Sequence, residues 1–198
     1  NAAAFAEMEK GVNLTRATLT ELRAAQALAD LVPSVDMVKF AKNGSNVTTA
    51  AVKIARAYTG RSLVCVPRQQ PFFSFDDWFI GTTSLKRGVP GAHVSNTLLF
   101  DYGDAASLQR LFDEHPGEIA AVMLEPATTM LPCAGACEQI AQWPASQCSA
   151  CPRNADNFLH RVQAMCRGDG ALFILDEMIT GFRWHIAGAQ TFFGVTPD

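Results

Sequence analysis

Two acidic residues, Asp176 and Glu177, stand directly after the apolar run 171–175. Adjacent carboxylates at the end of a buried strand cost free energy unless each has a partner. One possible partner is a ring nitrogen that a buried Asp keeps protonated. The alternative is a carboxylate that caps a neighbouring helix or pairs with Arg183, because ion-pair networks also gather acids. Composition alone leaves both interpretations open.

A second candidate is the segment Asn43-Gly44-Ser45-Asn46, which we expect to join a strand to the N-terminus of a helix. Free backbone N–H groups and the helix dipole at such a junction attract anions, and Gly44 would let a phosphate approach closely. A Ser-capped turn with no ligand has the same pattern. Phosphate binding is therefore one of two possibilities here.

The segment 71–79 holds five aromatic side chains within nine residues. Aromatic side chains grouped in this way usually fill the edge of a core or an interface, and they also stack on planar ligands. Packing is the better interpretation when the segment is taken by itself.

The six cysteines fall into two groups. Cys65 and Cys166 lie in apolar patterns and are expected to be buried thiols. The other four lie in a Cys-, Ala-, Pro- and Gln-rich stretch, residues 131–154, at positions 133, 137, 148 and 151. Four thiols at this spacing could enclose a zinc ion, with free thiols or disulfides as the alternatives. The spacing departs from known zinc ribbons, so we expect no bound metal at Cys133, Cys137, Cys148 and Cys151.

The elements that would position these residues alternate between helix and strand. Helices are predicted over residues 18–31, 45–58, 105–115 and 155–167, and strands over 35–40, 62–66, 96–100, 119–124 and 171–175. The first helix opens with capping-box spacing at Thr18 and Glu21. In the helix over 45–58, the predicted apolar face is Val47, Ala51, Ile54 and Ala55. Continuous apolar strands separated by helices indicate an α/β fold with a mostly parallel sheet and helices on both faces.

The candidate residues all follow predicted strands. Asn43–Asn46, the segment after Val66, Glu125 and Asp176 each stand at a carboxyl end. Parallel α/β sheets bind their ligands beyond that edge. The sequence therefore predicts one ligand site there.

Bulk properties narrow the function classes. Hydrophobic residues are 48%, charged residues 18%, and the net charge is -3. This composition is that of a globular chain and gives no electrostatic reason to expect nucleic acid or membrane partners. The length favours a single domain over residues 1–198. No secretion signal is recognisable, so we expect a cytoplasmic protein.

The order and spacing of four segments resemble the class III pyridoxal-phosphate-dependent aminotransferases. Lys42–Arg61 resembles the segment of that family that ends in TGR, and Asp176–Arg183 resembles its DE[VM]xTGFR motif. Val122–Pro126 is similar to the family strand that ends in Glu-Pro, and Gly188–Asp198 to the approach to its lysine. Within the family the similarity is greatest to glutamate-1-semialdehyde aminomutases and amino-sugar aminotransferases.

The resemblance implies the fold, the cofactor and its contacts. The fold would be part of the large domain of the type I pyridoxal-phosphate transferases, with residues 131–154 as an insertion. Asp176 would be the catalytic residue that holds the pyridine nitrogen of pyridoxal 5'-phosphate protonated. The other cofactor contacts would be Gly44, Ser45 and Asn46 at the phosphate, Phe72 and Met178 on the ring faces, and Glu125 near the phenolic oxygen.

The sequence also departs from the family pattern. Asn46 and Val47 replace an acid and an alanine, Phe73-Ser74 replaces His-Gly, and Met130 replaces an asparagine. The lysine that forms the Schiff base in the family would follow Asp198. The chain's own lysines, at positions 10, 39, 42, 53 and 86, lie in other contexts. We therefore expect these 198 residues to be the central part of a longer protein and inactive alone.

The resemblance implies amino-group transfer between a small-molecule amino donor and a carbonyl acceptor, or intramolecular transfer as in the aminomutases. It also implies a homodimer, with residues 72–79 at the interface. The alternative is a degenerate, non-catalytic homologue that serves as a binding or structural protein, which the departures at Phe73, Ser74 and Met130 would mark. A nucleotide-binding α/β protein is excluded because no Walker lysine or second glycine pair is present.

Overall fold

The computed structural model describes residues 1–12, 15–132 and 157–198. The chain divides into two compact units, residues 1–40 and 41–198, where the sequence predicts a single domain. Each unit is described by itself. The four cysteines from Cys133 to Cys151 lie outside the described residues, so the prediction about metal at these thiols stays a prediction.

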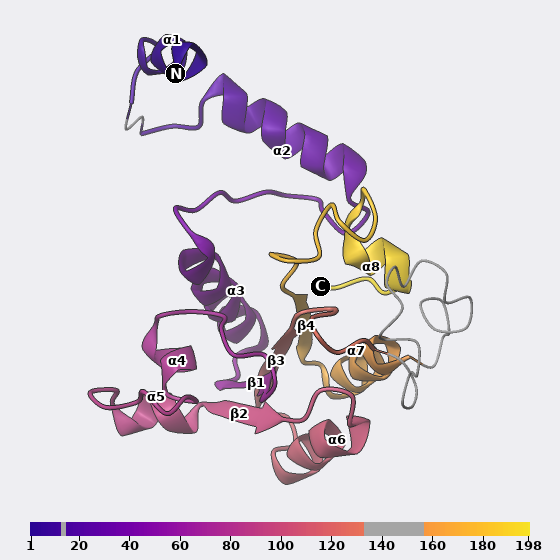
Figure 1. The fold of residues 1–198 in the computed structure, drawn as a ribbon. Helices are drawn as coiled ribbons and strands as arrows, with labels where there is room; N and C mark the ends of the chain where they lie inside the picture. Colours follow the sequence, from indigo (N-terminus) through magenta and orange to yellow (C-terminus); the bar gives the residue numbers. More distant parts are fainter. Residues whose placement is uncertain (13–14, 133–156) are drawn as a thin grey trace. The chain divides into compact units, whose positions relative to one another are not determined.

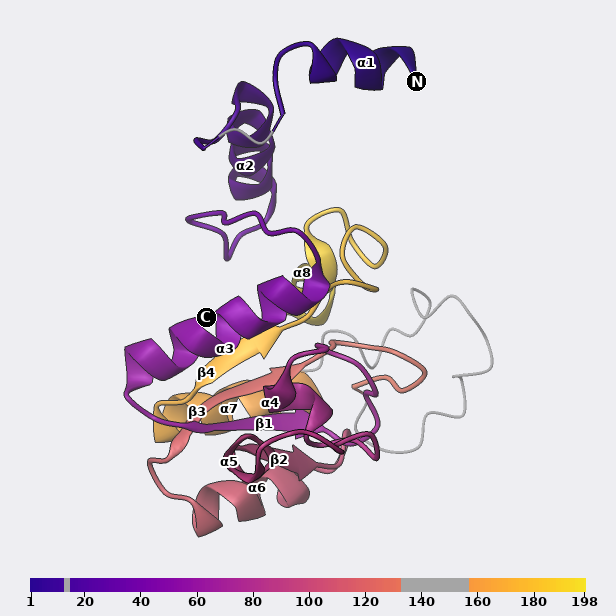
Figure 2. The ribbon, with the colours of Figure 1, turned by 90° about the vertical axis from the view of Figure 1, so that its left-hand side faces the viewer.

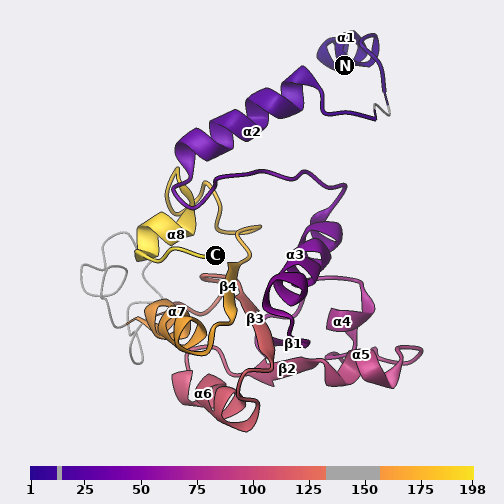
Figure 3. The ribbon, with the colours of Figure 1, turned by 180° about the vertical axis from the view of Figure 1, so that it is seen from behind.

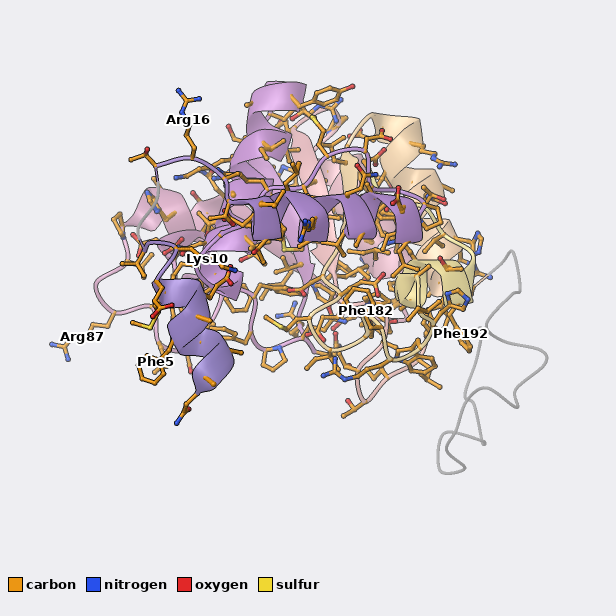
Figure 4. The ribbon with its side chains drawn as sticks, turned by 90° about the horizontal axis from the view of Figure 1, so that it is seen from above. Phe5, Lys10, Arg16, Arg87, Phe182 and Phe192 are labelled. Carbon is orange, nitrogen blue, oxygen red and sulfur yellow. The ribbon has the colours of Figure 1, made fainter. Side chains whose placement is uncertain are left out.

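The first unit consists of α1 (Ala2–Met8) and α2 (Leu19–Leu31). α2 begins with the predicted capping box, since Glu21 N donates to Thr18 Oγ1 at 3.1 Å and Thr18 N donates to Glu21 Oε2 at 2.6 Å. Figure 4 labels Phe5 on α1 and Lys10 just beyond it. Residues 35–40 form no strand, and that prediction is wrong. A strand needs a neighbour that accepts and donates its backbone hydrogen bonds, whereas Met37 is 92% exposed here.

The second unit is built on a four-stranded sheet in the order β2-β1-β3-β4 (Figure 1). The strands are β1 (Leu63–Pro67), β2 (Thr97–Phe100), β3 (Ile119–Leu124) and β4 (Leu172–Leu175). All three neighbouring pairs are parallel, which confirms the predicted parallel sheet. β3 is buried along its whole length, as expected for a strand covered on both faces.

Helices cover both faces of this sheet, as predicted. Figures 1 and 3 show α3 (Gly44–Thr59) on one side and α6 (Ala105–Glu114) and α7 (Phe158–Asp169) on the other. The short helices of this unit are α4 (Asp77–Ile80), α5 (Gly91–Ser95) and α8 (Gly188–Phe193). The larger core cluster includes side chains of α6 and α7, among them Leu108 and Leu159, and a second cluster includes Val52 of α3.

The buried face of α3 differs from the predicted one. Thr48, Val52 and Ala55 are buried, whereas Val47 is 47% and Ile54 is 64% exposed. The buried positions keep the helical spacing of three and four residues. Thr48 belongs to the inner face because its hydroxyl donates to Phe73 O at 2.8 Å. A polar residue therefore replaces the expected aliphatic one.

The two cysteines among the described residues are free and fully buried, as predicted. Burial, and to a lesser extent the charge of Asp169, raises the pKa of Cys65 to about 12. Burial likewise raises the pKa of Cys166. Both thiols therefore stay protonated at neutral pH and serve as core residues.

Candidate functional site

A pocket of about 970 Å³ opens at the carboxyl edge of the sheet. Its walls come from the first turn of α3, the loop after β1, and the ends of β3 and β4. Figure 2 shows the first turn of α3 on the same side as the arrowhead of β4. The pocket brings together all seven residues that the sequence predicts for the site: Gly44, Ser45, Asn46, Phe72, Glu125, Asp176 and Met178.

The first turn of α3 presents backbone donors to this pocket. The first backbone hydrogen bond of the helix is Val47 N to Asn43 O at 3.2 Å, and Asn46 N donates to the Asn43 side chain at 3.0 Å. The N–H groups of Gly44 and Ser45 thus precede the hydrogen bonds of the helix itself. A Cβ on Gly44 would lie 3.2 Å from Met178 Cε, so an alanine here would require the Met178 side chain to shift by a few tenths of an ångström. The turn has the geometry of an anion site.

The aromatic segment 71–79 divides between the pocket and the core. Phe72 is 47% exposed and meets Phe75 edge to face, with 4.8 Å between ring centroids. Phe73, Trp78 and Phe79 are buried in the cluster beside α3. Both interpretations of the segment therefore hold for part of it: Phe72 and Phe75 line the pocket, and the other three aromatic rings are core.

Asp176 and Glu177 have different partners although they are adjacent. Glu177 accepts hydrogen bonds from Ala189 N at 2.5 Å and from Gln190 N at 3.1 Å, both in the first turn of α8. Asp176 lies at the pocket, and its Oδ1 accepts from Met178 N at 2.9 Å. Arg183 donates to the backbone oxygens of Met178 and Ile179. The structural interpretation is thus right for Glu177, whereas Asp176 presents a carboxyl group to the pocket.

Glu125 also contributes a carboxyl group to the pocket, whose lining includes Asp76 and Glu177 as well. It is 9% exposed, and its Oε2 has no hydrogen-bond partner among the described residues. Burial and the nearby Asp176 raise the pKa of Glu125 to about 7. Burial also raises the pKa of Asp176, which the hydrogen bond from Met178 N opposes. Two partly desolvated carboxyl groups in one pocket favour a cationic or proton-donating ligand.

Several polar residues that support the pocket were not singled out in the sequence. Thr49 Oγ1 lies 3.1 Å from Ser74 Oγ and receives the indole N–H of Trp78 at 2.7 Å, which ties the aromatic segment to α3. Gln70 is 2% exposed and bonds to the backbone of Glu125. No sequence pattern distinguishes such a buried Gln from an exposed one. None of the five lysines lines the pocket.

No protein-family model matches the chain. Solved structures with the same fold include an omega-transaminase from Sphaerobacter thermophilus, 27% identical with a TM-score of 0.78 over 100% of this chain. They also include the FumI protein of Sphingopyxis sp. MTA144 in a form carrying pyridoxal phosphate, 26% identical with a TM-score of 0.75 over 100% of this chain. A glutamate-1-semialdehyde aminomutase from Pseudomonas aeruginosa PAO1 is 18% identical over 100% of this chain, with a TM-score of 0.71, and shows the fold alone.

The chain therefore has the α/β fold of the pyridoxal-phosphate-dependent transferases, which confirms the predicted fold class. It spans 44%, 43% and 40% of the lengths of these three proteins. No helix within residues 1–12, 15–132 and 157–198 has the length and apolar character that crossing a membrane requires.

The ionisation of Glu125 should make folding stability depend on pH. Its pKa is about 7 in the folded chain against an ordinary 4.5, so the stability it contributes is complete below about pH 4.5 and is lost as the pH rises to about 7. A Glu125→Gln variant does not titrate, and we expect it to be more stable than the wild type at pH 7.5 by on the order of 1–3 kcal/mol. Urea unfolding of the full-length protein at pH 5 and pH 7.5 measures this difference.

Asp176, whose pKa is also raised, leaves a smaller slope of the same sign in the Glu125→Gln variant. A variant that kept the whole wild-type pH dependence would show that Glu125 is not the group responsible.

Proposed function

We propose that this pocket binds pyridoxal 5'-phosphate and that the intact protein transfers amino groups. The observation that carries the proposal is the meeting, in one pocket, of an anion-binding helix turn, an exposed aromatic ring and a partly buried aspartate. The same three features resemble the phosphate, ring-face and ring-nitrogen contacts of the class III aminotransferases. The two transferase-fold structures above 25% identity support it, one named as a transaminase and one carrying pyridoxal phosphate.

The described residues fit this cofactor in chemistry as well as in position. Its phosphate would meet the N–H groups of Gly44 and Ser45, where a Cβ at residue 44 would already crowd Met178. The unpartnered Oε2 of Glu125 would meet the polar edge of the ring near the phenolic oxygen. Asn46 would complete the phosphate site, although its own N–H is taken by Asn43.

When bound, the cofactor supplies an electron sink for the carbanion that forms beside the transferred nitrogen. Asp176 would accept a hydrogen bond from the pyridine nitrogen and hold the proton there. The hydrogen bond from Met178 N to Oδ1 fixes that carboxylate and leaves Oδ2 for the ring nitrogen. Phe72 and Met178 would contact the two faces of the ring. Met123 and Ile174, which line the same pocket, would exclude water from the charged contact.

The substrates would be a small-molecule amino donor and a carbonyl acceptor, with transfer between two molecules or within one as in an aminomutase. We further propose a cytoplasmic homodimer with residues 72–79 at the interface. The 77% exposure of Phe75 supports such a contact.

The rival function is that of a non-catalytic homologue. Phe73 is buried in the core cluster beside α3, and Ser74 Oγ receives Asp76 N at 3.0 Å. These two departures from the family pattern have structural roles in the loop, so they give no specific support to the rival. The test is an assay of the full-length protein with pyridoxal phosphate, a panel of amines and a panel of aldehydes and ketones. Appearance of new amine supports the proposal, and its absence across both panels supports the rival.

Gly44 offers a test of the phosphate contact. In a Gly44→Ala variant the new methyl group would occupy the approach to the first turn of α3. We expect the affinity for pyridoxal phosphate to fall about tenfold, the effect of about 1.4 kcal/mol. The matched control is Gly168→Ala, another helical glycine, whose Cβ would meet nothing within 4 Å.

Fluorescence titration of both full-length glycine variants makes this comparison. Gly168→Ala should bind within about twofold of the wild type, since less than 0.5 kcal/mol separates them. Equal affinities of the two variants would mean that the phosphate does not lie at Gly44.

A further inference from the structure

Two consecutive glutamines follow β1, the strand that lies between β2 and β3. Gln69 reaches the end of β2, where its Oε1 accepts from Tyr102 N at 2.8 Å and its Nε2 donates to Asp101 Oδ1 at 2.9 Å. Gln70 reaches the end of β3, where its Oε1 accepts from Glu125 N at 2.8 Å and its Nε2 donates to Glu125 O at 2.9 Å. The two side chains therefore bond to opposite neighbours of the same strand.

The Gln70 amide continues the sheet beyond the backbone ladder. The paired residues of β1 and β3 run as far as Cys65 and Val122, short of Glu125. On the other side of β3, Asp176 N donates to Leu124 O at 2.9 Å. The side chain of Gln70 donates and accepts like a peptide group, so it satisfies both backbone groups of Glu125 in a place where water has little access.

The two hydrogen bonds from the Gln70 side chain to the backbone of Glu125, called the Gln70 clamp below, determine where the Glu125 carboxyl group lies. Pro126 restricts the backbone of the residue before it, and Tyr102 OH donates to Pro126 O at 2.6 Å. With its backbone held on both sides, Glu125 keeps its carboxyl group buried in the pocket with Asp176. Without the clamp, the end of β3 could move and water could reach the carboxyl group.

We propose that Gln70 is a positioning residue that fixes the Glu125 carboxyl group beside Asp176 in the pocket. Gln70 touches no substrate or cofactor in this account and acts through Glu125. Its importance for cofactor binding rests on the proposed function. The position of the carboxyl group itself does not, so the two ideas can fail separately.

The test follows the titration of Glu125 by carbon NMR of labelled glutamate carboxyl groups in the full-length protein without cofactor, with Glu125→Gln to assign the signal. Besides Glu125, the titratable groups that face this place are Asp176 and Tyr102. Burial raises the pKa of Glu125 to about 7. We expect Gln70→Ala to lower its titration midpoint by at least about one pH unit, because water then solvates the carboxylate.

The control is Gln69→Ala, which removes the bonds of the neighbouring glutamine to Tyr102 N and to the Asp101 side chain and should leave the midpoint of Glu125 unchanged. Gln70→Met keeps the buried volume while removing both hydrogen bonds, so it decides the matter if Gln70→Ala does not fold. An unchanged midpoint in a folded Gln70 variant would overturn the inference. So would a wild-type Glu125 that titrates near its ordinary value, a result that needs no Gln70 variant.

A second measurement separates this inference from the proposed function. If the wild type binds pyridoxal phosphate, Gln70→Met should weaken that binding about tenfold, the equivalent of about 1.4 kcal/mol, and Gln69→Ala should not. Wild-type affinity in Gln70→Met would overturn the positioning role for the cofactor. If the wild type binds no pyridoxal phosphate, the proposed function fails, and the clamp is still judged by the titration of Glu125.

Discussion

Replacing Asp176 with Asn is expected to lower the amino-transfer activity of the full-length protein by about 10²–10³-fold, the usual effect of losing one preorganised electrostatic contact. Asn keeps the shape of the side chain and still accepts from Met178 N, which now donates to Asp176 Oδ1 at 2.9 Å. It loses the negative charge that would hold the pyridine nitrogen protonated. Steady-state kinetics with saturating cofactor measures the loss.

The fold should survive this change. The pKa of Asp176 is raised by burial, so removing its charge should leave the free energy of unfolding at pH 7 unchanged or higher. Wild-type activity in a folded Asp176→Asn protein would remove Asp176 from the catalytic role. Asp176→Ala, in which the hydrogen bond from Met178 N is also absent, should likewise lose activity.

Replacing Glu177 with Ala should lower the stability of the fold and leave the affinity for pyridoxal phosphate unchanged. Its carboxylate accepts from Ala189 N and Gln190 N of α8 and from Thr180 Oγ1 at 3.1 Å. Loss of these partly buried, charge-assisted hydrogen bonds should lower the free energy of unfolding by about 2–3 kcal/mol. Urea unfolding measures the change, and Glu177→Gln, which keeps one acceptor oxygen, should lose less.

The folded fraction of a Glu177 variant should keep its affinity for pyridoxal phosphate, because the hydrogen bonds of the Glu177 side chain go to α8 and to Thr180. The two adjacent acids would then separate into one that serves the chemistry and one that serves the fold. A Glu177→Ala protein as stable as the wild type would show that the contacts with α8 contribute little.

Much of this fold could be predicted from the sequence because apolar runs and caps are local signals. The strand over 119–124 and the capping box at Thr18 and Glu21 are confirmed residue by residue. The strand expected over 35–40 is wrong because pairing depends on a neighbour that local sequence does not show. The buried face of α3 differs from the predicted one because Thr48 is held inward by a bond to Phe73 O, 25 residues away.

The candidate site could be predicted because residues with functional side chains directly follow the predicted strands. Asp176, Glu125 and Gly44 each follow or begin an element at the same edge, and the structure places them in one pocket. The sequence does not show which of Asp176 and Glu177 has a structural role, because Glu177 bonds to α8, which begins 11 residues further on. Gln70 could not be found because its role depends entirely on Glu125, 55 residues away.

The segment around α8 shows a further limit. Figure 4 labels Phe182 and Phe192 on this stretch. Phe182 has a φ of 59°, in the left-handed region that a bulky residue rarely adopts, and it is 59% exposed. Phe192 packs edge to face on Phe193, with 5.0 Å between ring centroids. Phe182 is therefore exposed and Phe192 partly buried, a difference that residue type does not reveal.

We propose that the pocket binds pyridoxal phosphate through its phosphate and its ring nitrogen together. Isothermal titration calorimetry of the full-length protein with pyridoxal phosphate, and then with pyridoxal, measures the two affinities that test this proposal. We expect saturable binding of one pyridoxal phosphate per chain, with pyridoxal bound at least about 100-fold more weakly, since about 2.7 kcal/mol would come from the anion contact at Gly44 and Ser45. Absence of saturable binding, or equal affinity for the two compounds, would contradict it.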